Sequence, residues 1–233
     1  MTIALKTTTL AALAALSLAA LAVADDTSGG TMAPKAMPAA RSHAPAGEPE
    51  RPRSLAIGAA ASLLDVKMTS VDGKELSIDD AKGAKGTLVV FECNGCPFVK
   101  AWQDRIVKIG NGAAAQGIGM IAIDSNDPSI VPGDGIDGMK QLASAKGYRF
   151  PYVADHGSKV ARAFGAGHTP EAFLLDASGK VVYHGAIDDN GEDASAVKLP
   201  HLANALTALS TGQEIQVKET KAIGCSIKYP TQG

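Results

Sequence analysis

Residues 87–98 read TLVVFECNGCPF, and this stretch decides the fold. Four of its first six residues are apolar and consecutive, which is typical of a strand buried on both faces of a parallel or mixed sheet. After Cys96, apolar residues recur at helical spacing. They are Val99, Trp102, Ile106 and Ile109. The pattern therefore predicts a buried strand, a turn that carries Cys93 and Cys96, and a helix.

Strand and helix patterns alternate along the rest of the chain. The expected strands are 63–69, 74–78, 117–124, 152–154, 171–175 and 181–184, and the further helices are 136–143, 159–164 and 202–209. Asp72-Gly73 between the first two strands is a hairpin signal. Strands that alternate with helices predict an α/β fold, here a mixed central sheet flanked by helices with an N-terminal β-hairpin extension.

The first 54 residues do not read as part of this domain. Residues 1–24 contain one lysine, then an apolar run, then small residues before Asp25. This pattern predicts a signal peptide that is cleaved near Ala24. The apolar run is shorter than the roughly 20 residues that a membrane span needs, so no stable membrane span is expected. Residues 25–54 hold five of the twelve prolines and no Ile, Leu, Val or aromatic residue, which predicts a disordered linker. The folded domain is then expected at 55–229.

Charge and cysteine count narrow the function classes. The formal net charge is −2, or −3 once Lys6 is removed with the signal, and there is no basic run that favours nucleic acid. An exported protein, periplasmic or extracellular, can hold disulfides. Three cysteines are an odd number, so one thiol is left over or pairs between chains.

The Cys93-Asn94-Gly95-Cys96 spacing predicts a redox pair. Cys93 is expected at the helix N-terminus, where free N–H groups stabilise the thiolate that attacks a disulfide. Cys96, about one turn on, would attack the mixed disulfide and release the product. A permanently closed structural disulfide is the plain alternative, and zinc is disfavoured because the sequence lacks a second ligand pair.

Beyond the pair itself, several longer stretches resemble one family. They are CNGCPFVKAWQDRI, SNDP, GYRFPYVAD, ARAFGAGHTPEAFLLDASGKVVYHGAIDD and the terminal IGCSIKY. Together they are similar to the peroxiredoxin-like (AhpC/TSA, redoxin) branch of the thioredoxin superfamily. The resemblance implies a thioredoxin-like fold in which Thr169-Pro170 is a cis-proline loop that faces the cysteines and binds the substrate backbone.

The resemblance also implies an alternative function, that of a thiol peroxidase with an antioxidant role. Peroxiredoxins carry Pro-x-x-x-Thr-x-x-Cys. Counted back from Cys93, those positions hold Gly86 and Val90, and counted back from Cys96 they hold Val89 and Cys93. Neither register supplies the proline and threonine of the peroxide pocket.

Other side chains could tune or extend the site. Glu92 could serve as a base or raise the pKa of Cys93 by repulsion, or it could be a solvated loop carboxylate. His168, near Pro170, could depress a thiol pKa or complete a copper site with both cysteines, as in a Sco-like chaperone. Cys225 is a possible third thiol in the C-terminal tail. Asp188 and three histidines, His156, His184 and His201, are expected at the surface.

The sequence thus predicts an exported thiol–disulfide oxidoreductase. Its redox centre would be the Cys93–Cys96 disulfide, without a cofactor, and its partners would be protein or small-molecule thiols and disulfides and an unknown electron donor. The alternatives are a peroxidase and a copper-binding chaperone.

Overall fold

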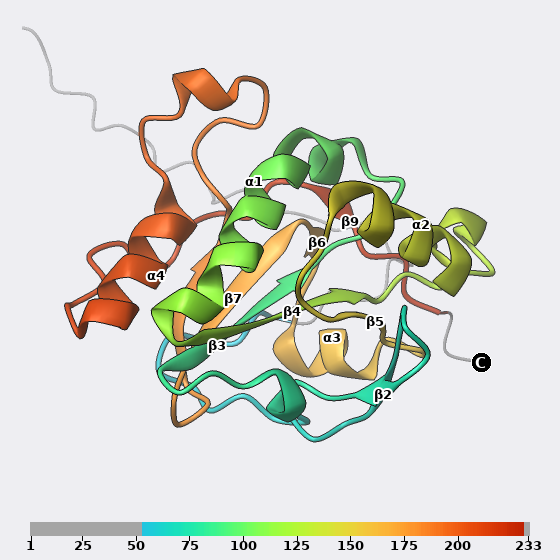
Figure 1. Ribbon diagram of the computed structural model, residues 1–233, viewed down its shortest axis with the longest axis horizontal. Coiled ribbons are helices and arrows are strands. Elements are labelled where there is room, and N and C mark those ends of the chain that lie inside the picture. The colour runs from blue at the N-terminus through green and yellow to red at the C-terminus, as the bar shows by residue number, and fades with distance from the viewer. Residues whose placement is uncertain (1–52, 231–233) are drawn as a thin grey trace, which may run out of the picture. The chain divides into compact units, whose positions relative to one another are not determined.

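The computed structural model describes residues 53–230, and these residues form a mixed seven-stranded sheet flanked by helices (Figure 1). The strand order is β2-β1-β5-β4-β3-β7-β8. The strands are β1 (Met68–Ser70), β2 (Glu75–Leu76), β3 (Gly86–Phe91), β4 (Ile118–Asp124), β5 (Tyr152–Ala154), β7 (Glu171–Asp176) and β8 (Val181–Gly185). Strands β3, β4 and β5 are parallel, whereas β7 runs antiparallel to β3 and β8.

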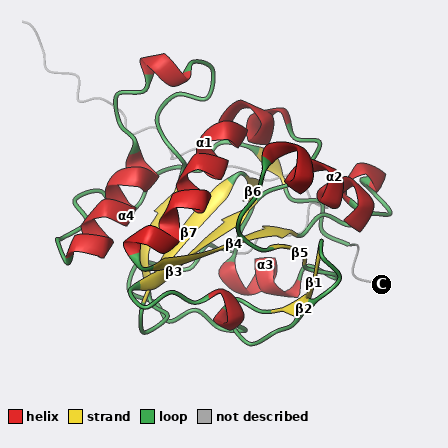
Figure 2. Cartoon of the chain, in the orientation of Figure 1, coloured by secondary structure: helices red, strands yellow, loops and turns green. Residues whose placement is uncertain are grey.

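Helices cover both faces of the sheet (Figure 2). The α-helices are α1 (Pro97–Ala113), α2 (Ile136–Lys146), α3 (Lys159–Phe164) and α4 (His201–Thr211). Four short 3-10 helices are η1 (Asp79–Ala81), η2 (Ala114–Gln116), η3 (Pro132–Asp134) and η4 (Ala194–Ala196). The predicted α/β architecture is therefore confirmed, including the N-terminal hairpin of β1 and β2.

Strand β3 is buried on both faces because its side chains serve two separate cores. Leu88 and Val90 pack in the cluster that contains residues of α1, α2 and α4. Val89 and Phe91 point to the opposite face, into the cluster with α3. This alternation follows from the two-residue period of a strand, and it explains the continuous apolar run at residues 88–91.

A second, two-stranded sheet lies where the chain returns to the cysteines. Strand β6 (His168–Thr169) pairs antiparallel with β9 (Cys225–Ser226). The peptide bond between Thr169 and Pro170 is cis, as the family resemblance implied. The C-terminal segment, expected within the domain but without a strand, therefore contributes β9 to this sheet.

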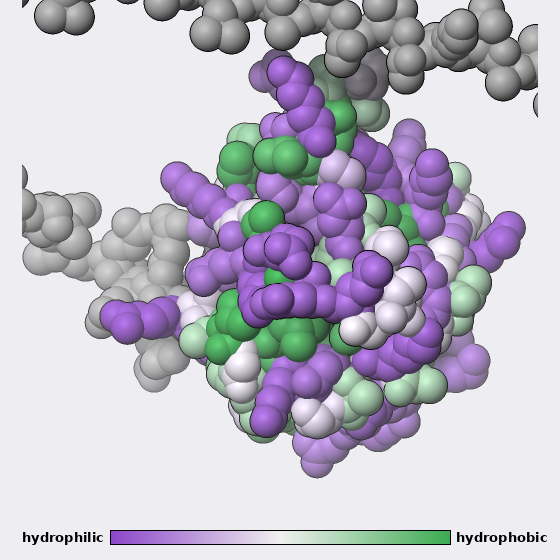
Figure 3. Space-filling view, turned by 90° about the vertical axis from the view of Figure 1, so that its left-hand side faces the viewer, coloured by the Kyte–Doolittle hydropathy of each residue, from purple (hydrophilic) through white to green (hydrophobic). Residues whose placement is uncertain are grey.

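The described residues present a mainly polar face on one side (Figure 3). Figure 3 shows one face on which hydrophilic residues predominate, with smaller hydrophobic patches between them. Large hydrophobic side chains are exposed at Leu63, Phe98, Ile130, Leu199, Val217 and Ile223. No helix within residues 53–230 has both the length and the apolar character needed to cross a bilayer.

The predicted signal peptide (1–24) and nearly all of the predicted linker (25–54) lie outside the described residues. The linker's last residue, Ser54, already contacts the domain, since its hydroxyl donates to the carbonyl oxygen of Gly165 at 3.1 Å. Leu55 N–H follows with a bond to the carbonyl oxygen of Phe164 at 2.9 Å. Within the described residues, Ser54 and Leu55, on either side of the predicted boundary, therefore both contact the domain.

Candidate active site

The two cysteines lie in the turn between β3 and α1. Proline at position 97 has no N–H to donate and fits the first position of a helix, so α1 begins there and Cys96 is its N-cap. The first helical bond runs from Lys100 N–H to the carbonyl oxygen of Cys96 at 3.0 Å. The expectation that Cys93 lies at the helix N-terminus is thus wrong: the structure gives that position to Cys96.

Both thiols contact the residue before the cis-proline. Cys93 Sγ lies 3.3 Å from Thr169 Oγ1, and Cys96 Sγ lies 3.2 Å from the Thr169 carbonyl oxygen. Cys93, Cys96 and Thr169 are all almost fully buried, with exposed fractions of 3, 4 and 2%. The structure therefore brings together the four residues expected at the centre of the site, the two cysteines and Thr169-Pro170.

A third thiol completes the cluster. Cys225 Sγ lies 2.8 Å from Cys96 Sγ, although 129 positions separate the two residues in sequence. All three cysteines are free thiols in the structure, and Cys225 is partly exposed. Sequence reasoning singled out Cys225, but no local pattern indicated that it would meet Cys96.

The contacts between the thiols shift their pKa values in opposite directions. A hydrogen bond from Cys93, and smaller contributions from Cys225 and the Val99 backbone, hold the pKa of Cys96 well below its usual range. The same bond raises the pKa of Cys93, and burial adds to that rise. Burial raises the pKa of Cys225 to about 11. These contacts and the helix N-terminus favour ionisation of Cys96, whereas the Thr169 carbonyl oxygen, which accepts from the Cys96 thiol, opposes it.

Buried acids lie next to the cysteine turn. Glu92 is completely buried, and its burial raises the pKa of the carboxyl to about 7. Tyr148 donates to Glu92 Oε1 at 2.6 Å, while Oε2 has no hydrogen-bond partner among the described residues. Of the three readings of Glu92 from the sequence, the solvated loop carboxylate is excluded.

Two aspartates that the sequence analysis missed adjoin the same turn. Asp134 Oδ1 accepts from the backbone N–H of Asn94 at 2.9 Å. Asp124 ends β4, and its burial, together with the charge of Asp134, raises the pKa of its carboxyl to about 8. The position of Asp124 at the end of an apolar strand was a usable signal, because parallel strands β3 and β4 end at the same edge of the sheet.

His168 faces a carboxylate in the structure. Its ring Nδ1 lies 3.8 Å from Glu171 Oε2, and its backbone N–H donates to the same oxygen at 2.9 Å. Among residues 53–230, no group of three or more His, Cys, Asp or Glu residues is arranged to hold a metal ion. The copper site with Cys93, Cys96 and His168 stays a prediction without support from this arrangement.

His184 and Asp188, both expected at the surface, are buried with charged or polar partners. His184 Nε2 lies 2.6 Å from Glu171 Oε1. Asp188 accepts from Trp102 Nε1 at 2.7 Å and from Arg105 Nη1 at 2.6 Å. Both expectations are wrong for one reason: a buried carboxylate or imidazole persists where a partner compensates its lost hydration, and such partners are distant in sequence.

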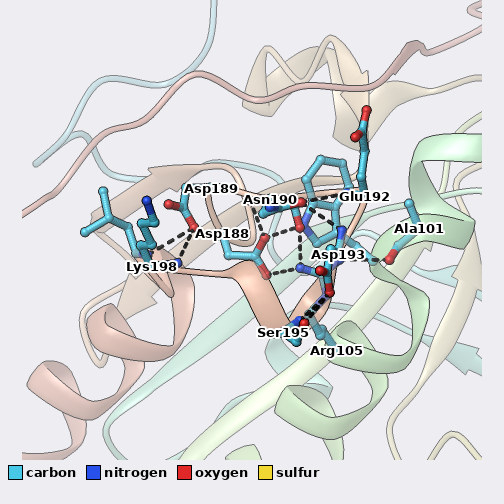
Figure 4. A network of polar contacts seen from close by, with 11 residues as sticks. Ala101, Arg105, Asp188, Asp189, Asn190, Glu192, Asp193, Ser195 and Lys198 are labelled. Carbon is cyan, nitrogen blue, oxygen red and sulfur yellow. Dashed lines mark hydrogen bonds and ion pairs between the residues drawn. The ribbon is translucent and has the colours of Figure 1, made fainter.

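The Asp188 contacts fix the loop after β8 to helix α1 (Figure 4). Arg105 reaches from α1 to the Asp188 carboxylate and also to the backbone carbonyl of Asn190 at 2.6 Å. Asp189 accepts from the backbone N–H groups of Lys198 and Leu199, both at 3.0 Å. The network therefore joins the middle of α1 to the loop after β8.

The geometry agrees with the comparison to known families. Residues 57–184 match the model of the AhpC/TSA family, so the chain belongs to that family. Its thioredoxin-like fold, with a cysteine pair between strand and helix facing a cis-proline, is the one that the resemblance implied.

The chain shows moderate sequence identity to curated proteins and to solved structures. The chain is 28% identical over 115 residues to thiol-disulfide oxidoreductase ResA of Bacillus thuringiensis, a match that covers 49% of this chain and 62% of the relative. The ResA protein of Geobacillus thermodenitrificans is 27% identical over 131 residues, covering 55 and 68%. A hypothetical protein from Sinorhizobium meliloti is 31% identical with a TM-score of 0.71, covering 77% of this chain and 98% of that protein. An uncharacterized conserved protein from Geobacillus kaustophilus is 34% identical with the same TM-score, covering 76 and 94%.

Proposed function

We propose that the protein is a thiol–disulfide oxidoreductase whose redox centre is the Cys93–Cys96 pair. The observation that carries the proposal is the contact of both sulfur atoms with Thr169, the residue before the cis-proline. The similarity to proteins named thiol-disulfide oxidoreductase supports it, over the part of their length that the match covers.

The position of Cys96 at the N-cap of α1 favours it as the thiol that attacks. Its thiolate displaces one sulfur of a substrate disulfide, that sulfur leaves as a thiolate and takes up a proton, and a mixed disulfide forms at Cys96. Cys93 then gives up its proton and attacks Cys96 Sγ, so that the second substrate sulfur leaves. The substrate disulfide is reduced to two thiols, and the Cys93–Cys96 dithiol becomes a disulfide. An electron donor, or the reverse reaction, restores the dithiol.

The surrounding residues have supporting roles in this proposal. Thr169 and Pro170 bind the substrate backbone beside the sulfur atoms. Glu92 tunes the thiols through its buried carboxyl, which changes charge near neutral pH. His168 would act on the thiols at longer range, through the Glu171 carboxylate that it contacts.

A redox titration in glutathione buffers, with thiol trapping and intact mass, tests the proposal. We expect a midpoint between about −120 and −270 mV, the range of exchange catalysts. A midpoint below about −300 mV would identify a structural disulfide and remove the basis for catalysis. The position within the range indicates whether the protein acts as an oxidant or a reductant.

Cysteine variants test the order of attack. Cys96→Ser should abolish reduction of a disulfide substrate such as insulin, whereas the double variant Cys93→Ser/Cys225→Ser, which has no second thiol at the site, should trap a mixed disulfide at Cys96. If Cys93→Ser abolishes the first attack and Cys96→Ser traps the adduct at Cys93, the order is the one expected from the sequence alone.

A thiol peroxidase is the second candidate, because membership of the AhpC/TSA family raises it. Val89, at the proline position counted from Cys96, is buried within β3, and Cys93 takes the threonine position. We therefore expect slow oxidation by hydrogen peroxide. Stopped-flow fluorescence measures the rate. Rapid, stoichiometric conversion of Cys96 to sulfenic acid would establish the peroxidase instead.

We also propose that the protein is exported, which rests on the sequence of residues 1–24. Intact-mass analysis of protein recovered from separated periplasmic and cytoplasmic fractions tests this. A mature chain that starts near Asp25 in the periplasm is expected, and an uncleaved cytoplasmic chain would contradict it.

A further inference from the structure

The C-terminal segment 224–229 is bound along the cis-proline loop. In the antiparallel pairing of β6 and β9, Cys225 lies opposite Thr169, and Ser226 lies opposite His168. The pairing continues with a bond from Ile227 N–H to the carbonyl oxygen of Gly167 at 3.1 Å. The segment thus adds a strand to the loop that contacts both catalytic sulfur atoms.

Contacts beyond Cys225 hold this strand firmly. Ile227 is buried in the core cluster with α3. The guanidinium of Arg162 lies 4.3 Å from the centre of the Tyr229 ring, and the carbonyl oxygen of Lys228 accepts from Asp127 N–H at 2.8 Å. Cys225 is therefore positioned by folded structure on its C-terminal side, and its contact with Cys96 is part of the fold.

Glycine at position 224 permits the close approach of the segment. A Cβ there would lie 2.1 Å from the carbonyl oxygen of Thr169, so a side chain would push the strand away from the loop. The main chain of the segment pairs with Thr169 and so occupies the position at which the proposed function binds the backbone of a substrate, which must displace the segment to pair there. The segment is thus arranged as a bound polypeptide would be, with its own thiol at Cys96.

We propose that Cys225 is a third exchange thiol, which closes a disulfide with Cys96 as an alternative to the Cys93–Cys96 disulfide. The inference rests on the proposed function, which supplies the substrate disulfide as oxidant. A disulfide joins sulfur atoms at about 2.05 Å, so the two atoms must approach by roughly 0.8 Å from the 2.8 Å that separates them.

The step balances with the same oxidant as before. Cys96 attacks the substrate disulfide, releases one substrate thiol and becomes a mixed disulfide. Cys225 loses its proton and attacks Cys96 Sγ, so that the bond between Cys96 and the substrate sulfur breaks and the second substrate thiol leaves. Two electrons pass from Cys96 and Cys225 to the substrate, and Cys93 keeps its thiol.

The test compares two variants of the purified protein, each with two cysteines at the site. Cys93→Ser and Cys225→Ser are oxidised with oxidised glutathione, the remaining thiols are blocked with N-ethylmaleimide, and linked peptides are identified by mass spectrometry. We expect Cys93→Ser to form an intramolecular Cys96–Cys225 disulfide. Cys96→Ser is the matched control, in which no disulfide between Cys93 and Cys225 is expected.

The two proposals fail in different ways. If Cys225→Ser forms the Cys93–Cys96 disulfide but Cys93→Ser ends with glutathione on Cys96 and a blocked Cys225, the third-thiol inference is overturned and the proposed function stands. If Cys225→Ser fails to close its pair, the proposed function fails.

The wild-type protein provides a test that does not depend on the folding of a variant. Trapped at partial oxidation and mapped in the same way, it should contain both linked peptides. Only Cys93–Cys96 links at every glutathione ratio would overturn the inference.

Discussion

At the scale of single residues, a fully buried carboxyl group directly precedes the cysteine turn in the chain. Glu92 has one oxygen bonded to Tyr148 and, among the described residues, no partner for the other. Burial without full hydrogen bonding favours the neutral acid, which is why its pKa rises to about 7. The charge of Glu92 therefore changes near neutral pH.

Replacing Glu92 should alter the pH dependence of stability. The folded carboxyl keeps its proton up to about pH 7, against an ordinary pKa of 4.5. The stabilisation by the protonated form is thus full below about pH 4.5 and is lost as the pH rises through 7. Between pH 5 and 8 the wild type should lose up to roughly 3 kcal/mol more unfolding free energy than Glu92→Gln.

Urea unfolding at both pH values measures this difference. Glu192→Gln, which changes an exposed carboxylate, is the control and should follow the wild type. Equal losses in wild type and Glu92→Gln would show that Glu92 is ionised without cost in the folded protein.

At the scale of elements, the sequence predicted those parts that have a local pattern. Strand β3 and helix α1 were readable because apolar residues mark them continuously or at helical spacing. Strands β6 and β9 have two residues each and pair across more than 50 positions, so no period could reveal them. The helix was correctly expected after Cys96, but the position at its N-terminus was assigned to Cys93, whereas Pro97 begins the helix and makes Cys96 the N-cap.

The pairing of β9 with the cis-proline loop can be tested through Gly224. A Cβ at this position meets the Thr169 carbonyl at 2.1 Å, and such overpacking costs about 1–3 kcal/mol. In Gly224→Ala we expect slower Cys96–Cys225 disulfide formation in the Cys93→Ser background and faster alkylation of Cys96.

Gly167→Ala is the matched control on the opposite side of the pairing, because a Cβ there meets no atom within 4 Å. Rates are measured by quenched N-ethylmaleimide labelling and peptide mass. Unchanged rates in Gly224→Ala would show that the strand adapts without moving Cys225.

At the scale of the whole molecule, the choice of disulfide determines how much of the chain is crosslinked. A Cys93–Cys96 bond closes a very short loop, whereas Cys96 and Cys225 are 129 positions apart. A long loop removes more conformational entropy from the unfolded chain than a short one. The oxidised forms of the two variants should therefore differ in global stability, although both disulfides lie in the same cluster.

Thermal unfolding of the oxidised and reduced variants tests this consequence. By loop entropy, the Cys96–Cys225 bond should add about 5 kcal/mol and the Cys93–Cys96 bond about 2 kcal/mol. With about 2–4 °C per kcal/mol for a domain of this size, oxidation should raise the Tm of Cys93→Ser by roughly 6–12 °C more than that of Cys225→Ser. Calorimetry of each variant with its reduced form as reference measures the shift. Equal shifts would mean that the native strain of the long-range bond offsets its entropic gain, and that Cys225 exchanges with Cys96 without stabilising the fold.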